Sequence, residues 1–297
     1  MSAVTIVSPR SAIAAATARL REAGVETPRV DAEWLLAGLL GLGRASLMAN
    51  LGRELPSALA SRYETFVARR ERREPLQHIL GWEEFCGLRF TVTADVLVPR
   101  PETETLVEWA LALLLPAGAG GKSVIDVGTG SGCIACALAA ARPDLRVVGV
   151  DISPAAVRLA RENAFALALN DRVTVVESDL FGSLAGSRFD LVVANPPYLS
   201  APILSGLAPE VVVYEPSLAL DGGVDGLRVI RRLVAEAPAR LMPGGTLALE
   251  TAGSAHVTEI AALMSTAGFV NISTRRDLAR IERFIAGHLP SGDDGGG

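Results

Sequence analysis

Residues 124–132 read VIDVGTGSG, and an apolar stretch follows them at 133–141. β-Branched residues, then closely spaced glycines, then helix-forming residues predict a buried strand, a tight turn and a helix. Glycines give such a turn the positive φ angles and the close approach that a bound ligand needs. The spacing G-x-G-x-G differs from the dinucleotide fingerprint G-x-G-x-x-G, and the stretch does not match a P-loop. We therefore expect an α/β domain whose first turn binds a ligand of another kind.

Two further strands are expected to end at the same edge of the sheet. The strand predicted at 146–150 ends in Asp151, which is placed to accept hydrogen bonds from both hydroxyls of a ribose. The strand predicted at 173–176 leads into Asp179 and Leu180, a carboxylate and an apolar side chain that could hold an adenine. The glycine turn and these two strand ends, in this order, indicate a ligand-binding site more strongly than the glycine turn alone.

A fourth predicted strand, 189–194, ends in Asn195-Pro196-Pro197-Tyr198. Neither proline has an N–H for a central strand, so the chain must turn out at the carboxyl end, where open α/β sheets bind ligands. The prolines also fix φ and hold the neighbouring groups rigidly. Such a turn can accept two N–H bonds from a planar –NH2 group and cover it with the Tyr198 ring. In isolation this would be a plain proline-rich turn, but the preceding motifs favour a binding site.

These motifs resemble the class I S-adenosyl-L-methionine-dependent methyltransferases, in the N-methylating branch that carries Asn-Pro-Pro-Tyr. The resemblance implies a Rossmann-like α/β domain. It implies that the cofactor S-adenosyl-L-methionine contacts residues at the four strand ends: Gly128, Thr129, Gly130, Ser131, Gly132, Asp151, Asp179, Leu180 and Asn195. It also implies that a target amide or amine is bound by Asn195, Pro196, Pro197 and Tyr198, among which Asn195, Pro196 and Tyr198 are catalytic.

Three stretches outside these motifs indicate which family of these methyltransferases the chain resembles. They read EPLQHILG at 74–81, VLVPRPETE at 96–104 and YEPSLALDGGVDGL at 214–227. Together they are similar to the bacterial release factor glutamine methyltransferase family (PrmC, also called HemK), and the similarity covers about residues 10–285. It implies methyl transfer to the side-chain amide nitrogen (N5) of the glutamine in the Gly-Gly-Gln motif of peptide chain release factors. Arg100 and Glu102 would then take part in substrate binding.

The sequence departs from this family's pattern at two places. Leu180 stands where members often have an aromatic residue, which weakens the stacking expected at the adenine edge. The segment 277–283 lacks the Gly-Arg-Asp-Arg spelling usual near the C-terminus, and we assign it no role.

The composition of the 297-residue chain indicates its class of partners. The net charge of -5 and the pI near 5.4 argue against a broad nucleic-acid surface, which is usually basic. The arginine-rich run at 69–73 is more typical of a solvated helix end than of a binding patch. No apolar span of 18 residues and no signal-peptide pattern occur. We expect a cytoplasmic protein without a membrane partner or direct nucleic-acid contact.

Cys133 and Cys136 form a C-x-x-C spacing, which also occurs in redox-active and metal-binding sites. The three histidines are isolated, and Ala137 stands where a haem attachment would need histidine. Positions i and i+3 share one face of a helix, so we interpret the two thiols as packing residues and expect no metal.

The chain is expected to form two domains. Ser8-Pro9 and Thr27-Pro28 predict helices that run to about residues 22 and 40. Further helical patterns make 1–75 a small helical domain that docks the substrate. Residues 76–94 are the linker, with a β-hairpin that turns at 86–87. The methyltransferase domain covers 95–289, with a largely parallel sheet, and 290–297 is expected to be a disordered tail.

The expected chemistry follows from the delocalised lone pair of a carboxamide nitrogen, which attacks a sulfonium methyl group poorly. If the Asn195 oxygen and the Pro196 carbonyl accept its N–H bonds, they stabilise the charge that develops there. No strong general base is evident, and residues 199–213 are expected to form a loop that could reach over the site. Alternative readings are methylation of a ribosomal protein glutamine or of adenine N6 in DNA. A non-catalytic, cofactor-dependent binding or assembly protein is a third.

Overall fold

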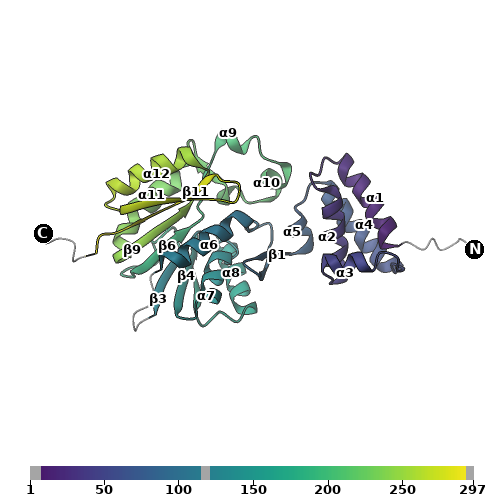
Figure 1. Cartoon of the computed structure of the whole chain (residues 1–297), viewed down its shortest axis with the longest axis horizontal. Coiled ribbons are helices and arrows are strands. Elements are labelled where there is room, and N and C mark those ends of the chain that lie inside the picture. The colour runs from purple at the N-terminus through teal and green to yellow at the C-terminus, as the bar shows by residue number, and fades with distance from the viewer. Residues whose placement is uncertain (1–7, 115–120, 292–297) are drawn as a thin grey trace, which may run out of the picture. The chain divides into compact units, whose positions relative to one another are not determined.

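The computed structural model describes residues 8–114 and 121–291, which divide into two compact units (Figure 1). The first, here called the helical unit, comprises the described residues up to Trp82 together with 208–214. The second, the sheet unit, comprises the described residues of 83–207 and of 215 onward. Most of the expected tail at 290–297 lies outside the described residues, which end at 291.

The helical unit contains α1 (Pro9–Glu22), α2 (Pro28–Leu40), α3 (Arg44–Ala49), α4 (Ser57–Glu71), α5 (Leu76–Leu80) and α10 (Pro209–Tyr214). At the start of α1, Ser8 and Ser11 each accept a hydrogen bond from the other's backbone N–H, which is a capping box. At α2, Thr27 forms no such cap, and its hydroxyl donates to the Asp31 carboxylate at 2.7 Å. The helices predicted at 9–22 and 28–40 are confirmed.

The core of the helical unit is formed by apolar faces of α1, α2 and α4. Its fully buried side chains include Leu20, Leu35, Leu36, Tyr63 and Val67. The Tyr63 hydroxyl donates to the carbonyl of Ala32 at 2.9 Å, so the one polar atom of this ring is satisfied inside the core.

The interpretation of the arginine-rich run as a solvated helix end is wrong for Arg70. Its side chain is buried, and it donates to Asp31 at 2.7 Å and to Glu210 at 2.8 Å. Arg73 donates to both carboxylate oxygens of Glu210 at 2.7 Å. The end of α4 is therefore an ion-pair cluster that fixes α10.

The segment after Asn-Pro-Pro-Tyr is more ordered than the loop expected at 199–213. It forms β7 (Leu199–Ser200) and α9 (Ala201–Leu204), and its last part is α10 of the helical unit. The Tyr214 hydroxyl donates to the Arg72 carbonyl at 2.7 Å, which adds a second fixed point beside Glu210.

A seven-stranded sheet forms the centre of the second unit, in the order β10-β11-β9-β6-β3-β4-β5. Its strands are β3 (Lys122–Val127), β4 (Leu145–Asp151), β5 (Val173–Glu177), β6 (Phe189–Ala194), β9 (Leu241–Glu250), β10 (Val270–Arg276) and β11 (Glu282–His288). Strands β9, β6, β3, β4 and β5 pair in parallel, and β11 is antiparallel to both of its neighbours. The predicted α/β fold with a largely parallel sheet is confirmed.

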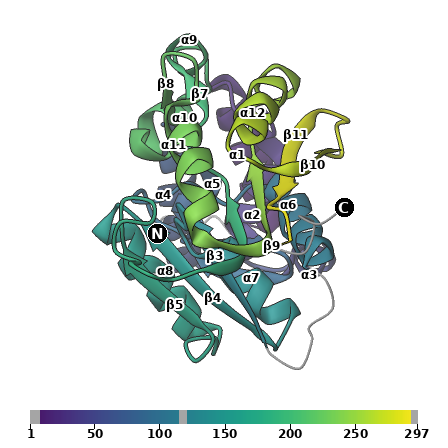
Figure 2. The same ribbon diagram turned by 90° about the vertical axis from the view of Figure 1, so that its left-hand side faces the viewer.

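Helices cover both faces of this sheet (Figure 2). One face packs against α6 (Pro101–Leu113), α7 (Cys133–Ala141) and α8 (Pro154–Ala166), and the other against α11 (Arg228–Glu236) and α12 (Ser254–Thr266). Side chains alternate along β6, so Leu191 and Val193 enter the first core while Val192 and Ala194 enter the second. This burial on both faces explains why β6 reads as a continuous apolar run.

A small hairpin, β1 (Trp82–Phe85) with β2 (Leu88–Thr91), turns at Cys86-Gly87 as predicted. Both turn residues have positive φ, 50° and 72°, as a two-residue hairpin of this twist requires. The side chain of Asn163 on α8 bonds to the N–H and carbonyl of Thr91, which holds β2 against the sheet unit.

The Pro-Gly-Gly sequence at 243–245, which is typical of a turn, lies inside β9 in the structure. The pairing with β6 jumps from Phe189–Leu241 to Leu191–Thr246, so the residues between Leu241 and Thr246 form an irregularity in an otherwise continuous strand. The remaining short elements are β8 (Asp221–Gly223), which pairs with β7, and the 3₁₀ turns η1 (Ser217–Ala219) and η2 (Ala237–Arg240).

Two features are absent from the described residues. None of the helices in residues 8–114 and 121–291 combines the length and the apolar character needed to cross a membrane. Within the same ranges, no group of three or more histidine, cysteine or acidic side chains is arranged to hold a metal ion.

Candidate active site

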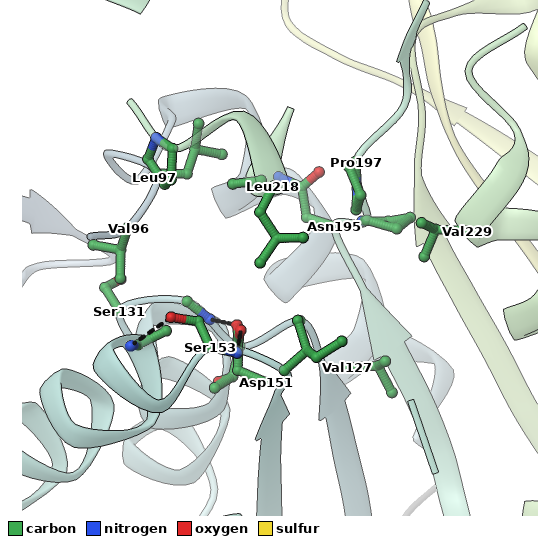
Figure 3. A pocket seen from close by; sticks show the side chains of 18 of the residues that line it. Val96, Leu97, Val127, Ser131, Asp151, Ser153, Asn195, Pro197, Leu218 and Val229 are labelled. Carbon is green, nitrogen blue, oxygen red and sulfur yellow. Dashed lines mark hydrogen bonds between the residues drawn. The ribbon is translucent and has the colours of Figure 1, made fainter. Parts of the chain in front are cut away.

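A cavity of about 320 Å³ opens at the carboxyl ends of β3, β4, β5 and β6 in the sheet unit (Figure 3). Most of the residues expected at the site line it: Gly128, Thr129, Gly130, Ser131, Asp151, Asp179, Leu180, Asn195, Pro196, Pro197 and Arg100. Gly132, Tyr198 and Glu102 lie outside the lining. The four strand ends therefore meet at one site, as the ordered motifs predict.

The glycine turn is bound to the end of β4. The N–H groups of Gly128 and Thr129 both donate to the Val150 carbonyl, at 2.8 and 2.9 Å. Gly128 has φ 75°, and a Cβ built there meets no atom within 4 Å, so the turn leaves open space on the cavity side. Gly132 serves packing, since its Cβ would lie 3.1 Å from the Cβ of Ala160 on α8.

Asp151 lies at the tip of β4 with its carboxylate in the cavity wall (Figure 3). Its Oδ2 accepts from the Gly130 N–H and its Oδ1 from the Ser153 N–H, both at 2.9 Å. Burial raises its pKa, while these backbone bonds oppose the shift. Each oxygen keeps lone-pair capacity beyond one bond, so the carboxylate can accept from a ligand's hydroxyl groups.

Beyond β5, Asp179 and Leu180 form another part of the wall. Leu180 is buried at an unusual φ of 49°, which turns the chain there. Asp179 is half exposed and accepts from both Nη atoms of Arg232 at 3.1 Å. Arg232 also lines the cavity, and sequence reasoning missed it because this pairing joins residues far apart in the chain.

Asn195 leaves the end of β6 beside Pro196 and Pro197 at the cavity. Its amide nitrogen donates to the Thr103 hydroxyl at 3.2 Å. No hydrogen bond to its Oδ1 occurs among the described residues, so this acceptor is available to a ligand. Thr103 on α6, which sequence reasoning missed, lines the same cavity.

Tyr198 does not cover the cavity with its ring. The two prolines turn the chain so that the ring packs against the core shared by β6, β9 and α12. Its hydroxyl donates to Oε1 of Glu250 at 3.3 Å, and burial raises the pKa of this phenol.

Arg100 and Glu102, which were both expected to bind substrate, differ in their position relative to the cavity. Arg100 lines the cavity and donates to Oε2 of the buried Glu215 at 2.5 Å. Glu215 also accepts from the Val98 N–H at 3.2 Å, so the segment before α6 is fixed to the segment after α10. Glu102 is exposed on the first turn of α6.

Asp126 is a buried carboxylate that sequence reasoning missed. It lies inside β3, where its Oδ2 accepts from the Thr129 hydroxyl at 2.6 Å and from the Ala135 N–H at 3.2 Å. Its Oδ1 has no hydrogen-bond partner in the described parts of the chain. Burial raises its pKa to about 7. The sequence feature that could have identified Asp126 is an acidic residue in an otherwise apolar strand, just before the glycine turn.

Cys133 and Cys136 pack in the core between α7 and the sheet, as predicted. Cys136 is fully buried, whereas Cys133 also forms part of the cavity wall. Burial raises the pKa of both thiols, to about 12 for Cys136, so both stay protonated and unreactive.

Comparison with known proteins gives consistent matches over the chain. Residues 11–81 match the family model described as PrmC N-terminal domain, and 108–206 match the methyltransferase small domain. The release factor glutamine methyltransferase of Geobacter sulfurreducens is 47% identical over 271 residues, which cover 91% of this chain and 93% of that protein. The enzyme of the same name from Deinococcus radiodurans is 44% identical over 95% of this chain and 99% of its own.

A solved structure supports the fold. The T. thermophilus 16S rRNA N2 G1207 methyltransferase, in complex with AdoMet and guanosine, superimposes with a TM-score of 0.51. It is 24% identical, and the match covers 70% of this chain and 49% of that one.

Proposed function

The chain belongs to the family of release factor glutamine methyltransferases, and from this premise we propose that it methylates the glutamine of the Gly-Gly-Gln motif in peptide chain release factors. The methyl donor would be S-adenosyl-L-methionine and the acceptor the side-chain amide nitrogen N5. One observation carries the proposal: a single cavity joins the glycine turn and Asp151 to the free acceptor of Asn195.

The residues of the cavity fit the proposed cofactor. Gly128 and Gly130 leave room where a Cβ would project, which suits a ligand held closely against backbone. Asp151 offers acceptors for ribose hydroxyls, and the apolar Ile152 and Leu180 offer a surface for adenine. When bound, the cofactor supplies an electrophilic methyl group on a sulfonium.

Asn195 and Pro196 would activate the amide. The Asn195 Oδ1 and the Pro196 carbonyl can accept the two N–H bonds of the target –NH2 group, which raises electron density at nitrogen. With the cofactor bound, its sulfonium would supply the methyl group to this nitrogen and keep the electron pair of the broken S–C bond, and the nitrogen proton would leave to water. Fixed acceptors of this kind contribute about 3–4 kcal/mol each to transition-state stabilisation.

We further propose that the helical unit docks the protein substrate. The described residues that line the cavity all belong to the sheet unit, so the helical unit is not needed to hold the cofactor. The net charge of -5 agrees with a protein acceptor and gives no support to direct nucleic-acid binding. Activity on release factors would place the protein in the cytoplasm.

The test is incubation with methyl-labelled cofactor and, separately, a release factor, ribosomal proteins and DNA. Label is expected on the release factor and should be lost when the loop glutamine is replaced by alanine. Labelling of DNA or ribosomal protein at an equal or higher rate would contradict the proposal.

A further inference from the structure

We propose that Asn163 is a positioning residue that holds two walls of the cavity together and so preorganises the cavity for the cofactor. One wall is the glycine turn, and the other is the segment 95–100, which follows the hairpin. The inference rests on the proposed function, in which this cavity binds S-adenosyl-L-methionine. It concerns a side chain of α8 that does not itself line the cavity.

Asn163 is a buried residue whose side-chain oxygen and nitrogen are both hydrogen-bonded. It is 2% exposed, and an unpaired amide at such a place would cost free energy. Its Oδ1 accepts from the Thr91 N–H at 2.8 Å. Its Nδ2 donates to the Thr91 carbonyl at 3.0 Å and to the Ser131 carbonyl at 2.9 Å. One side chain therefore connects α8 both to the end of β2 and to the glycine turn.

The bond to Ser131 fixes the second half of the glycine turn, whereas backbone bonds to β4 fix the first half. The three glycines of the turn have φ of 75°, 55° and 81°, and glycine loses more conformational freedom on ordering than any other residue. The peptide group between Ser131 and Gly132 is held at both of its polar atoms. Its carbonyl accepts from Asn163, and its N–H donates to the Thr129 carbonyl at 2.8 Å. A planar peptide bound on both sides keeps one orientation, so Ser131 stays in the cavity wall.

Helix α8 comes close enough for this bond because Gly132 has no side chain. A Cβ at Gly132 would lie 3.1 Å from the Cβ and 3.3 Å from the Cα of Ala160. Ala160 lies one turn before Asn163 on the same face of α8. The helix and the glycine turn therefore meet at a backbone contact, and the Asn163 amide bonds across it.

The bonds to Thr91 attach the second wall to the same helix. Thr91 is the last residue of β2, and the segment 95–100 that lines the cavity follows shortly after it. Val96 of this segment, which Figure 3 shows at the cavity, is buried in a cluster with Ala156 and Leu159 of α8. Both walls are thus held by one helix, by Asn163 at one end and by this apolar cluster at the other.

This arrangement should affect cofactor binding more than the chemical step. A cavity whose walls are already ordered binds its ligand with a smaller loss of conformational entropy. The hydrogen bonds of Asn163 in the described part of the chain reach these two walls and not Asn195. Its removal should therefore raise the dissociation constant of the cofactor and leave the activation of the substrate amide intact.

The first experiment is calorimetry of the full chain with S-adenosyl-L-methionine, for wild type and N163A. We expect the dissociation constant to rise about tenfold in N163A, the order expected when neutral hydrogen bonds that preorganise a site are lost. At saturating cofactor, kcat on release factor should change less than about threefold. A purely structural role would lower stability without this split. The matched control is N170A, an exposed asparagine shortly after α8, which should bind the cofactor as wild type does.

N163D tests the two donor bonds separately from the acceptor. An ionised aspartate has the shape of asparagine and can still accept from the Thr91 N–H, but it cannot donate to the carbonyls of Thr91 and Ser131. N163D should therefore weaken cofactor binding at least as much as N163A does.

Hydrogen exchange of the wild-type protein tests the connection without a substitution. The residues of β2 do not line the cavity, so a bound cofactor can slow their exchange only through the protein. We expect slower exchange of the β2 amides when the cofactor is bound to wild type, and no such change in N163A.

The outcomes distinguish this inference from the proposed function. N163A or N163D with the wild-type dissociation constant, or β2 amides of wild type that exchange equally fast with and without cofactor, would overturn the inference alone. A wild-type protein that does not bind the cofactor would overturn the proposed function and this inference with it.

Discussion

Asn195 follows the end of β6 at the cavity and Asp126 is buried inside β3 before the glycine turn, and only Asn195 was recognised from the sequence. Asn195 precedes two prolines, and its position follows from the end of a strand that cannot continue. Thr103 and Glu250 form hydrogen bonds to residues 92 and 52 positions away, Asn195 and Tyr198, whereas Asp126 accepts from the nearby Thr129 and Ala135. Residue type alone does not distinguish a buried carboxylate or hydroxyl from an exposed one, so the sequence carried little signal for Thr103 and Glu250, while Asp126 could be noticed only as an acid in an apolar strand.

The buried Asp126 should make the stability of the protein depend on pH. Its pKa is raised to about 7, whereas an unfolded aspartate has a pKa of about 3.9. Between these values the folded protein binds more protons, so this contribution is present at low pH and is lost as the pH rises through about 7. Glu250, whose pKa is raised to about 7, acts in the same direction.

We therefore expect the free energy of unfolding to fall between pH 5 and pH 7, by up to about 1.4 kcal/mol per pH unit for one group. D126N should make this slope smaller, and urea unfolding at four pH values measures it. The control is D144N, because Arg142 lowers the pKa of Asp144 and leaves it charged throughout this range. An unchanged slope in D126N would contradict this account of Asp126.

Among the secondary-structure elements, α10 is the one whose place the sequence could not indicate. The helices at 9–22 and 28–40 follow from Ser-Pro and Thr-Pro signals, and the strands follow from apolar runs. The membership of α10 in the helical unit depends instead on Glu210, which pairs with an arginine 140 positions earlier. Local propensity contains no information on such a pairing.

E210A should loosen α10 and leave cofactor binding unchanged. Glu210 is the partner of both Arg70 and Arg73, and its removal leaves part of the buried Arg70 guanidinium without its acceptor. We expect a loss of stability of about 1–3 kcal/mol, as for hydrogen bonds to charged groups. Denaturant unfolding and calorimetry with the cofactor measure the two quantities.

The control for this change is E64A, since Glu64 also pairs with an arginine but is 55% exposed. Exposed pairs contribute about 0–1 kcal/mol, so E64A should have a small effect. A fall in cofactor affinity in E210A would mean that the cavity depends on α10, contrary to the division into units described above.

Taken as one chain, the protein combines a helical unit and a sheet unit that sequence patterns separate well. The patterns predicted helices before residue 75 and a largely parallel sheet after residue 95, because helical patterns fill the first stretch while apolar strand-like runs alternate with helical patterns in the second. They missed the return of 208–214 to the helical unit, since a contiguous reading assigns each stretch to its neighbours. They also expected the Tyr198 ring at the cavity, whereas the ring packs in a core.

The central claim is that the Asn195 acceptor activates a glutamine amide of a release factor for methyl transfer. The most direct measurement is a single-turnover reaction with tandem mass spectrometry of the Gly-Gly-Gln peptide, for wild type and N195A. Wild type should add one methyl group to the side-chain nitrogen of that glutamine. N195A should react about a hundredfold more slowly, the usual cost of removing one preorganised polar group, while it still binds the cofactor. Methylation at another atom, or N195A reacting at the wild-type rate, would contradict the claim.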